Sequence, residues 1–222
     1  MGQATFGFVS VILGAIILWE FATRVQQGIM TGFLEDVWTQ NFMNFFASPL
    51  KVIEYLSGSI LMSITTGVVG FLVATVLAGA AFGYNMFQAG LLLIPFMAIL
   101  FLFGVAMGIF VSALIFKLGP TAEWLGWPIP MVISVFAGVF YPVSTLPKAL
   151  QIIAHCIPAS YIFDSVRFVL SGQAGRGELV SNLLIATFLS FVYLSLAYVF
   201  FIRIYHQNLR NGAIPQFSAE SF

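Results

Sequence analysis

Charged side chains are scarce in this sequence of 222 residues, and their scarcity decides the class of protein. Only 7% of the residues are charged and 60% are hydrophobic, whereas soluble domains carry about 25% charged residues. Eight basic and eight acidic residues balance to a net charge of zero, and no polybasic cluster is present. The composition gives no reason to expect a nucleic-acid ligand, and it indicates an integral membrane protein.

Cysteine and histidine are almost absent as well. The single cysteine, Cys156, excludes an intrachain disulfide framework. Because His155 and His206 are far apart in the chain, we expect neither a metal site nor catalytic residues. The sequence also lacks the G-x-x-x-x-G-K-S/T phosphate loop, so we expect this chain to bind no nucleotide or other cofactor and not to be an enzyme.

Long intervals without charge are what the sequence has instead. A bilayer core of about 30 Å needs about 20 apolar residues per helix, and on that count the sequence predicts five membrane-spanning helices. The predicted spans are residues 4–22, 56–81, 91–116, 122–141 and 179–202. Pro128 and Pro130 lie inside the fourth span, where we expect a kink or a broken first turn. The predicted fold class is an all-α integral membrane protein, with residues 1–222 in one transmembrane domain.

Small residues recur at every fourth position in the second and third predicted spans. Gly70 belongs to such a stripe in the second span, and Gly104 and Gly108 belong to one in the third. Stripes of this kind permit close contact between helices in a membrane. We interpret them as packing surfaces of the helix bundle.

An amphipathic segment lies in the polar interval between the first two predicted spans. On a helix over residues 34–48, Glu35 and Asp36 fall in the first turn, where acidic side chains suit the helix dipole. The apolar face of this helix is formed by Leu34, Trp38, Phe42, Phe45 and Phe46. Such a helix can lie in the membrane interface or press against a soluble partner, and the residues alone leave both uses open.

Residues 138–170 interrupt the apolar chain with prolines and charges. Each proline removes a backbone donor and disfavours helix in the residue before it, so we expect two short helices, over about 148–157 and 160–170. The prolines are Pro142, Pro147 and Pro158. Non-helical backbone at membrane depth survives only where protein or a water-filled cavity satisfies its polar groups. The segment 142–170 is therefore either a re-entrant element or an external loop on the headgroups.

Polar side chains in this segment have two interpretations each. Asp164 and Arg167 are three residues apart and can pair along one helix, either at the headgroups or desolvated beside a pathway. Tyr141 and Tyr161 are either interface anchors or residues that line a gate.

Orientation follows from the basic residues near the span ends. With the 23–54 interval in the cytoplasm, five basic residues lie inside and three lie outside. The inner five are Arg24, Lys51, Lys117, Arg203 and Arg210, and the outer three are Lys148, Arg167 and Arg176. This arrangement predicts that the amphipathic helix is cytoplasmic and that the re-entrant segment is on the outer side.

The stretch AGVFYPVSTLPKALQIIAHCIPASYIFDSVRFVL, residues 137–170, resembles the permeases of type-2 ATP-binding cassette (ABC) transporters. The matching positions are Gly138, Phe140, Tyr141, Pro142, Leu146, Pro147, Pro158, Tyr161, Asp164 and Arg167. Upstream, FLEDVWTQNFMNFFASPLKVIEYLSG is similar to the family's cytoplasmic connection, with an acidic pair before an amphipathic helix and a Ser-Pro. Members usually have six spans, and this chain begins at what resembles their second, so we expect the first span to be missing.

This resemblance implies a permease that exports an amphiphilic polysaccharide, lipid or drug across the plasma membrane, such as a bacterial inner membrane. It implies three partners: an ATPase subunit that binds ATP and Mg²⁺, a second permease copy, and membrane lipids. The implied ATPase contacts are Glu35, Asp36, Trp38, Phe42 and Phe45. The implied outer gate is formed by Gly138, Phe140, Tyr141, Pro142, Pro147, Pro158, Tyr161, Asp164 and Arg167. The alternative function is a membrane scaffold that recruits a soluble partner through its amphipathic helix without transporting anything.

Overall fold

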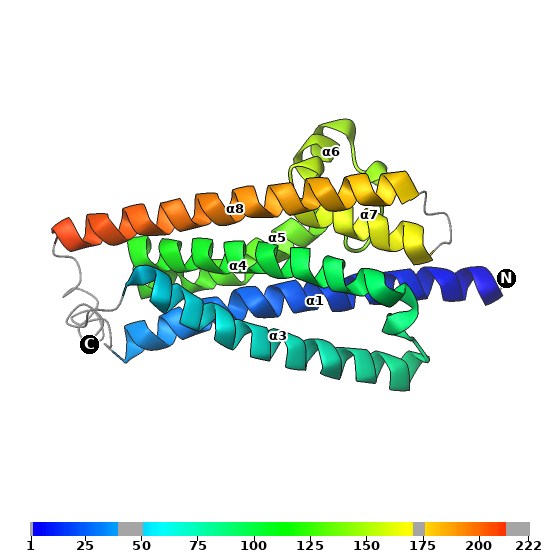
Figure 1. Ribbon diagram of the computed structural model, residues 1–222, viewed down its shortest axis with the longest axis horizontal. Coiled ribbons are helices and arrows are strands. Elements are labelled where there is room, and N and C mark those ends of the chain that lie inside the picture. Colours follow the sequence, from blue (N-terminus) through cyan, green and yellow to red (C-terminus); the bar gives the residue numbers. More distant parts are fainter. Residues whose placement is uncertain (1, 40–50, 171–175, 212–222) are drawn as a thin grey trace.

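The computed structural model describes residues 2–39, 51–170 and 176–211, and its regular elements in these ranges are all helices (Figure 1). Four long helices run along the long axis: α1 (Gly2–Trp38), α3 (Val52–Phe82), α4 (Leu93–Leu118) and α8 (Arg176–Asn211). Helix α3 runs antiparallel to α1, α4 and α8, so these three helices end at the same end of the bundle at which α3 begins (Figure 1). We call this the hairpin end of the bundle.

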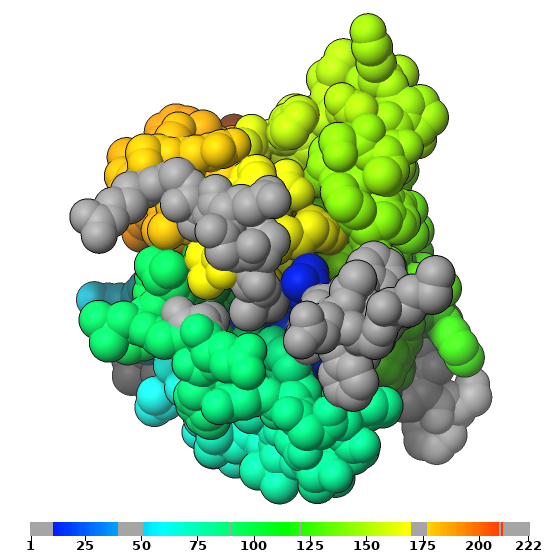
Figure 2. All heavy atoms as spheres, turned by 90° about the vertical axis from the view of Figure 1, so that its right-hand side faces the viewer, coloured from blue at the N-terminus to red at the C-terminus, as the bar shows by residue number. Residues whose placement is uncertain are grey.

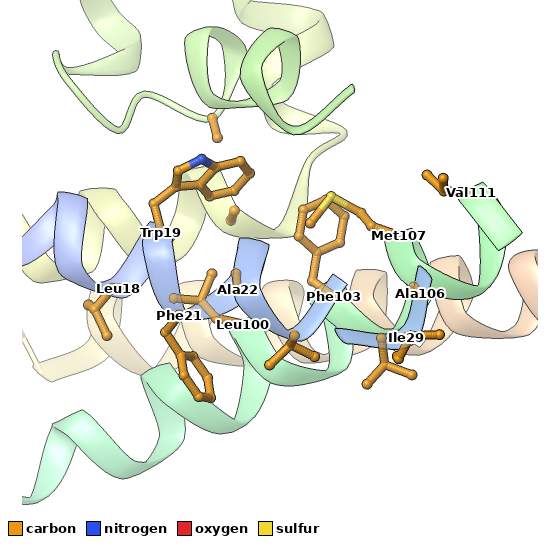
Figure 3. Packing of buried hydrophobic residues seen from close by; sticks show 14 of the residues in the cluster. Leu18, Trp19, Phe21, Ala22, Ile29, Leu100, Phe103, Ala106, Met107 and Val111 are labelled. Carbon is orange, nitrogen blue, oxygen red and sulfur yellow. The ribbon is translucent and has the colours of Figure 1, made fainter. Parts of the chain in front are cut away.

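Helix α4 is the centre of the bundle. In the most apolar stretch of 18 residues of α4, 78% of the residues are buried. The corresponding stretches of α3 and α8 are 22% and 17% buried. Figure 3 shows Leu100, Phe103 and Met107 of α4 packed beside Ala22 and Ile29 of α1. The outer faces of α3 and α8 instead carry exposed apolar side chains, among them Leu61, Val73, Val76, Leu184 and Phe188. An apolar exterior around an apolar core is what a lipid environment requires.

Glycines on α3 and α4 bring these helices close to α1, as the small-residue stripes predict. A Cβ atom on Gly104 would lie 2.6 Å from the carbonyl oxygen of Ala22, and one on Gly108 would lie 2.9 Å from Cβ of Ile29. On α3, a Cβ atom at Gly70 would collide with the side chain of Arg24. The predicted packing role of these glycines is therefore confirmed.

Helix α1 is one continuous helix of 37 residues that contains the first predicted span, 4–22, and continues to Trp38. The predicted start of a separate amphipathic helix at residue 34 is therefore wrong, and residues 40–48 of that helix lie outside the described residues. The buried side chains of α1 recur every three or four residues through the interval that we expected to be a connection, and this stripe packs on α3 and α4. The stripe contains Ala22, Val25, Ile29, Phe33 and Val37. At 1.5 Å per residue α1 is about 55 Å long, well beyond the hydrocarbon core of about 30 Å.

The fourth predicted span, 122–141, is also wrong as a single helix. The chain instead forms a 3₁₀ helix, η2 (Pro120–Gly126), and a nine-residue helix, α5 (Pro128–Phe136). Nine residues extend only about 14 Å and cannot cross a bilayer. Pro128 begins α5, as a residue without a backbone donor can, and Gly138 turns the chain at a φ of 71° just after it.

Among residues 11–39, 51–88, 90–119, 121–169 and 177–208, whose side chains the structure describes, three helical segments are long and apolar enough to cross a membrane. They are Val52–Phe82, Gly90–Leu118 and Gly177–Asn208. These three candidate spans contain the predicted spans 56–81, 91–116 and 179–202. A bent pair described below raises the number to four if it is one span, so the predicted number of five is not confirmed.

The segment 142–170 is broken, as predicted from its prolines. A short 3₁₀ helix, η3 (Val143–Thr145), precedes α6 (Lys148–His155) and α7 (Pro158–Leu170), and α6 and α7 are bent by 100° relative to one another. Helix α7 packs on α8, α4 and α1. Helix α6 stands out from the body of the bundle, as the side view and the end view both show (Figures 1 and 2).

Candidate functional site

The end of α1 and the start of α3 are joined by a hydrogen bond at the hairpin end. The Tyr55 hydroxyl donates to a carboxylate oxygen of Asp36 at 2.7 Å. Glu35 and Trp38 stay exposed beside this bond, and the Trp38 side chain is 57% exposed. Of the five predicted ATPase contacts, the structure thus brings together Glu35, Asp36 and Trp38. Phe42 and Phe45 lie outside the described residues.

A polar groove of about 480 Å³ runs between α1 and α3 toward this same end. Arg24 lies in it and pairs with Glu20 at 2.8 Å, with both side chains about half exposed. The groove is lined by Arg24, Gln27, Gly28, Thr31, Gly32, Glu35, Asp36, Ser59, Met62 and Thr66. Ionisable residues along a membrane helix are energetically costly and usually face a polar cavity or partner. This groove therefore marks the polar face of the bundle.

Gln26 is a polar residue that our reading of the sequence missed. Its side chain is fully buried, and its amide nitrogen donates to the Gly126 carbonyl at 3.3 Å and approaches the Met30 sulfur at 3.9 Å. Its carbonyl oxygen has no hydrogen-bond partner among the described residues. The signal was present in the sequence, because Gln26 falls on the apolar stripe of α1 between Ala22 and Phe33.

Arg167 of α7 holds the turn that follows α5. Its guanidinium donates to the carbonyl of Tyr141 at 2.9 Å and to that of Val139 at 3.5 Å, and it also donates to the carbonyl of Gly138. Asp164 accepts from the same guanidinium at 3.0 Å. The Arg167 side chain is only 17% exposed. The expected ion pair is thus present, but its cation binds backbone carbonyls as well.

The two tyrosines of the predicted gate close turns within the same segment. The Tyr141 hydroxyl donates to the carbonyl of Val135 at 2.7 Å, and the Tyr161 hydroxyl donates to that of His155 at 3.0 Å. Phe140, which also belongs to the predicted gate, is 47% exposed. Tyr141 thus ties the start of the segment to α5, and Tyr161 ties α7 to α6.

The prolines of the predicted gate separate its short helices. Pro142 precedes η3, Pro147 precedes α6, and Pro158 is the first residue of α7. At the bend, the buried Ser160 hydroxyl lies 2.8 Å from the carbonyls of both Ala154 and Ile157. The same two carbonyls also accept from the backbone N–H groups of Ile157 and Ser160, so the hydroxyl adds a second donor at the junction of α6 and α7. The bend is thus stabilised by specific hydrogen bonds.

An apolar cavity of about 780 Å³ separates α5 from α4 and α8. It exists because α5 packs mainly against η2 and α6 and stands off from the bundle. Its walls include Phe103, Met107 and Phe110 of α4, Ile129, Ile133 and Phe136 of α5, Cys156 and Ile157 of the bend, and Tyr193, Leu196, Phe200 and Arg203 of α8. Sequence reasoning predicted no such cavity.

A bundle of several long apolar helices defines a multi-pass membrane protein. The family model described as "ABC-2 family transporter protein" matches residues 2–199. The chain therefore belongs to the ABC-2 transporter family, and it is a permease domain rather than a catalytic one. A comparison with curated proteins gave no match.

Proposed function

We propose that this chain is the permease subunit of an exporter in the plasma membrane, and that it moves an amphiphilic substrate out of the cytoplasm. A separate ATPase subunit binds ATP and Mg²⁺ and supplies the energy, since the sequence has no phosphate loop. Two permease chains and two ATPases form the working unit, because one half cannot enclose a path. Family membership supports transport and does not favour the scaffold alternative.

The observation that carries the proposed ATPase contact is the exposed pair at the hairpin end. Glu35 and Trp38 project from the last turns of α1, and an exposed tryptophan beside a carboxylate suits a protein interface. The bond between Tyr55 and Asp36 holds this pair in place relative to α3. A force applied to the hairpin end thus reaches two long helices at once.

The polar groove and the broken segment supply the two ends of the proposed route. Over residues 24–36 the groove extends about 18 Å along α1 from the hairpin end, and its polar lining suits the polar part of an amphiphile. At the other end, the contacts of Arg167 tie α7 to the turn after α5. These elements would then move as one rigid gate when the two permease halves shift.

The ATPase contact is tested by a double variant, Glu35→Lys with Trp38→Asp. The chain is purified from its native membranes, and ATP hydrolysis by the retained proteins is measured. We expect wild type to retain an ATPase and the double variant to lose it, because the variant reverses one charge and removes the apolar anchor.

Glu178→Lys is the matched control. Glu178 is an exposed glutamate in the first turn of α8, at the opposite end of the bundle (Figure 1). This variant should retain the ATPase. Absence of ATP hydrolysis in the wild-type preparation, or equal retention by the double variant, contradicts the proposal.

A further inference from the structure

The apolar cavity between α4, α5 and α8 has the depth of one bilayer leaflet. Along α8 it extends from Tyr193 to Arg203. Ten residues of helix correspond to about 15 Å, and the hydrocarbon core of a bilayer is about 30 Å thick. Its volume of about 780 Å³ falls within the range of about 300–1,000 Å³ that ligand pockets have.

The walls of the cavity suit a ligand that has a hydrocarbon chain and an anionic group at one end. Ser195 lines the cavity, but its hydroxyl already donates to the carbonyl of Phe191 at 2.8 Å. Of the described residues that line the cavity, Arg203 alone is charged, and its side chain is exposed. Within the described part of the chain, no carboxylate pairs with it.

We propose that this cavity binds a bilayer phospholipid with an anionic headgroup. One acyl chain fills the space between α5 and α8, and the phosphate binds Arg203 at the membrane surface. Charge complementarity at Arg203 selects the headgroup, while the apolar walls accept any chain of leaflet length. The site is separate from the polar groove of α1 and α3, and its test needs neither an ATPase nor a transported substrate.

Cys156 provides a reporter within the protein itself. It is the single cysteine of the chain, it is exposed, and it lines the cavity. The delipidated chain in detergent is titrated with phosphatidylglycerol, with phosphatidylcholine as the neutral comparison, and the rate at which N-ethylmaleimide modifies Cys156 is measured. We expect phosphatidylglycerol to slow the modification at a lower concentration than phosphatidylcholine does.

Arg203→Gln should raise the half-protecting concentration of phosphatidylglycerol about fivefold. This factor corresponds to the roughly 1 kcal/mol that one basic residue contributes beside anionic lipid. Arg210→Gln is the matched control, because Arg210 is an exposed arginine near the end of the same helix that does not line the cavity. Its titration should match that of wild type.

Three outcomes would overturn the proposal. The first is a modification rate that phosphatidylglycerol does not change. The second is the same titration for Arg203→Gln as for wild type, or the same shift for Arg210→Gln. The third is protection that rises with protein concentration instead of lipid concentration, because the occupant would then be a helix of a second copy.

Discussion

Replacing Gly104 with alanine tests the packing of α1 on α4. The new Cβ atom would lie 2.6 Å from the carbonyl oxygen of Ala22, where ordinary contact begins at 3.4 Å. The two helices must therefore separate by about 0.8 Å at this point, and the atom in the way is backbone that cannot rotate aside. Overpacking of this kind costs about 1–3 kcal/mol, against a gain of about 0.5–1 kcal/mol from replacing a helical glycine.

Gly32→Ala is the control, because the same change on α1 meets no atom within 4 Å. It should gain the helix-propensity term alone. For a domain of this size a change of 1 kcal/mol shifts Tm by about 2–4 °C. We therefore expect Gly104→Ala to lower Tm by up to about 10 °C and Gly32→Ala to raise it by about 1–4 °C.

Tryptophan fluorescence during thermal unfolding in detergent measures both variants under one condition. Because the two substitutions are identical, a difference in sign isolates the contact with Ala22 from any general effect of alanine in a helix. A Gly104→Ala protein that is as stable as Gly32→Ala would refute the close approach of α1 and α4.

Two further predictions concern hydrogen bonds that hold the ends of the bundle. Arg167→Ala should lower the free energy of unfolding by about 1.5–3 kcal/mol, because partly buried carbonyls lose a charged donor. Arg167→Lys should recover only part of this loss, and full recovery with lysine would show that the several carbonyl contacts are unimportant. Tyr55→Phe should lower the free energy of unfolding by about 0.5–1.5 kcal/mol and increase amide hydrogen exchange near Asp36 in the last turn of α1. Unchanged exchange there would contradict the anchoring of the hairpin end.

The broken segment and the long apolar helices could be predicted because each depends on local chemistry. Pro147 precedes α6, which begins at Lys148 as expected, and Pro158 begins α7 two residues before the predicted start at residue 160. The uncharged run between Tyr55 and Lys117 is long enough for two helices and forms α3 and α4. Neither inference needed knowledge of what lies next to these residues.

The continuity of α1 was missed because charges were counted without regard to the helical face on which they lie. Arg24, Glu35 and Asp36 suggested a connection between spans, yet all three lie in or beside the groove while the opposite stripe is buried. The partners of Arg167 and the cavity beside α5 depend on how distant segments meet, 26 residues apart for Arg167 and Tyr141. Spacing along the chain carries no information about such contacts.

The unbroken course of α1 has a mechanical consequence. Trp38 lies at its hairpin end, and Trp19 contacts Phe163 of α7 with ring centroids 6.1 Å apart. If α1 pivots where Ala22 meets Gly104, the arm to Trp38 is about 24 Å and the arm to Trp19 only about 4.5 Å. If α1 tilts about this pivot, the sideways displacement at Trp19 is about one fifth of the displacement at Trp38. A displacement along the helix axis is instead the same at both residues. Helix α1 is therefore suited to transmit axial motion to α7 and not sideways motion.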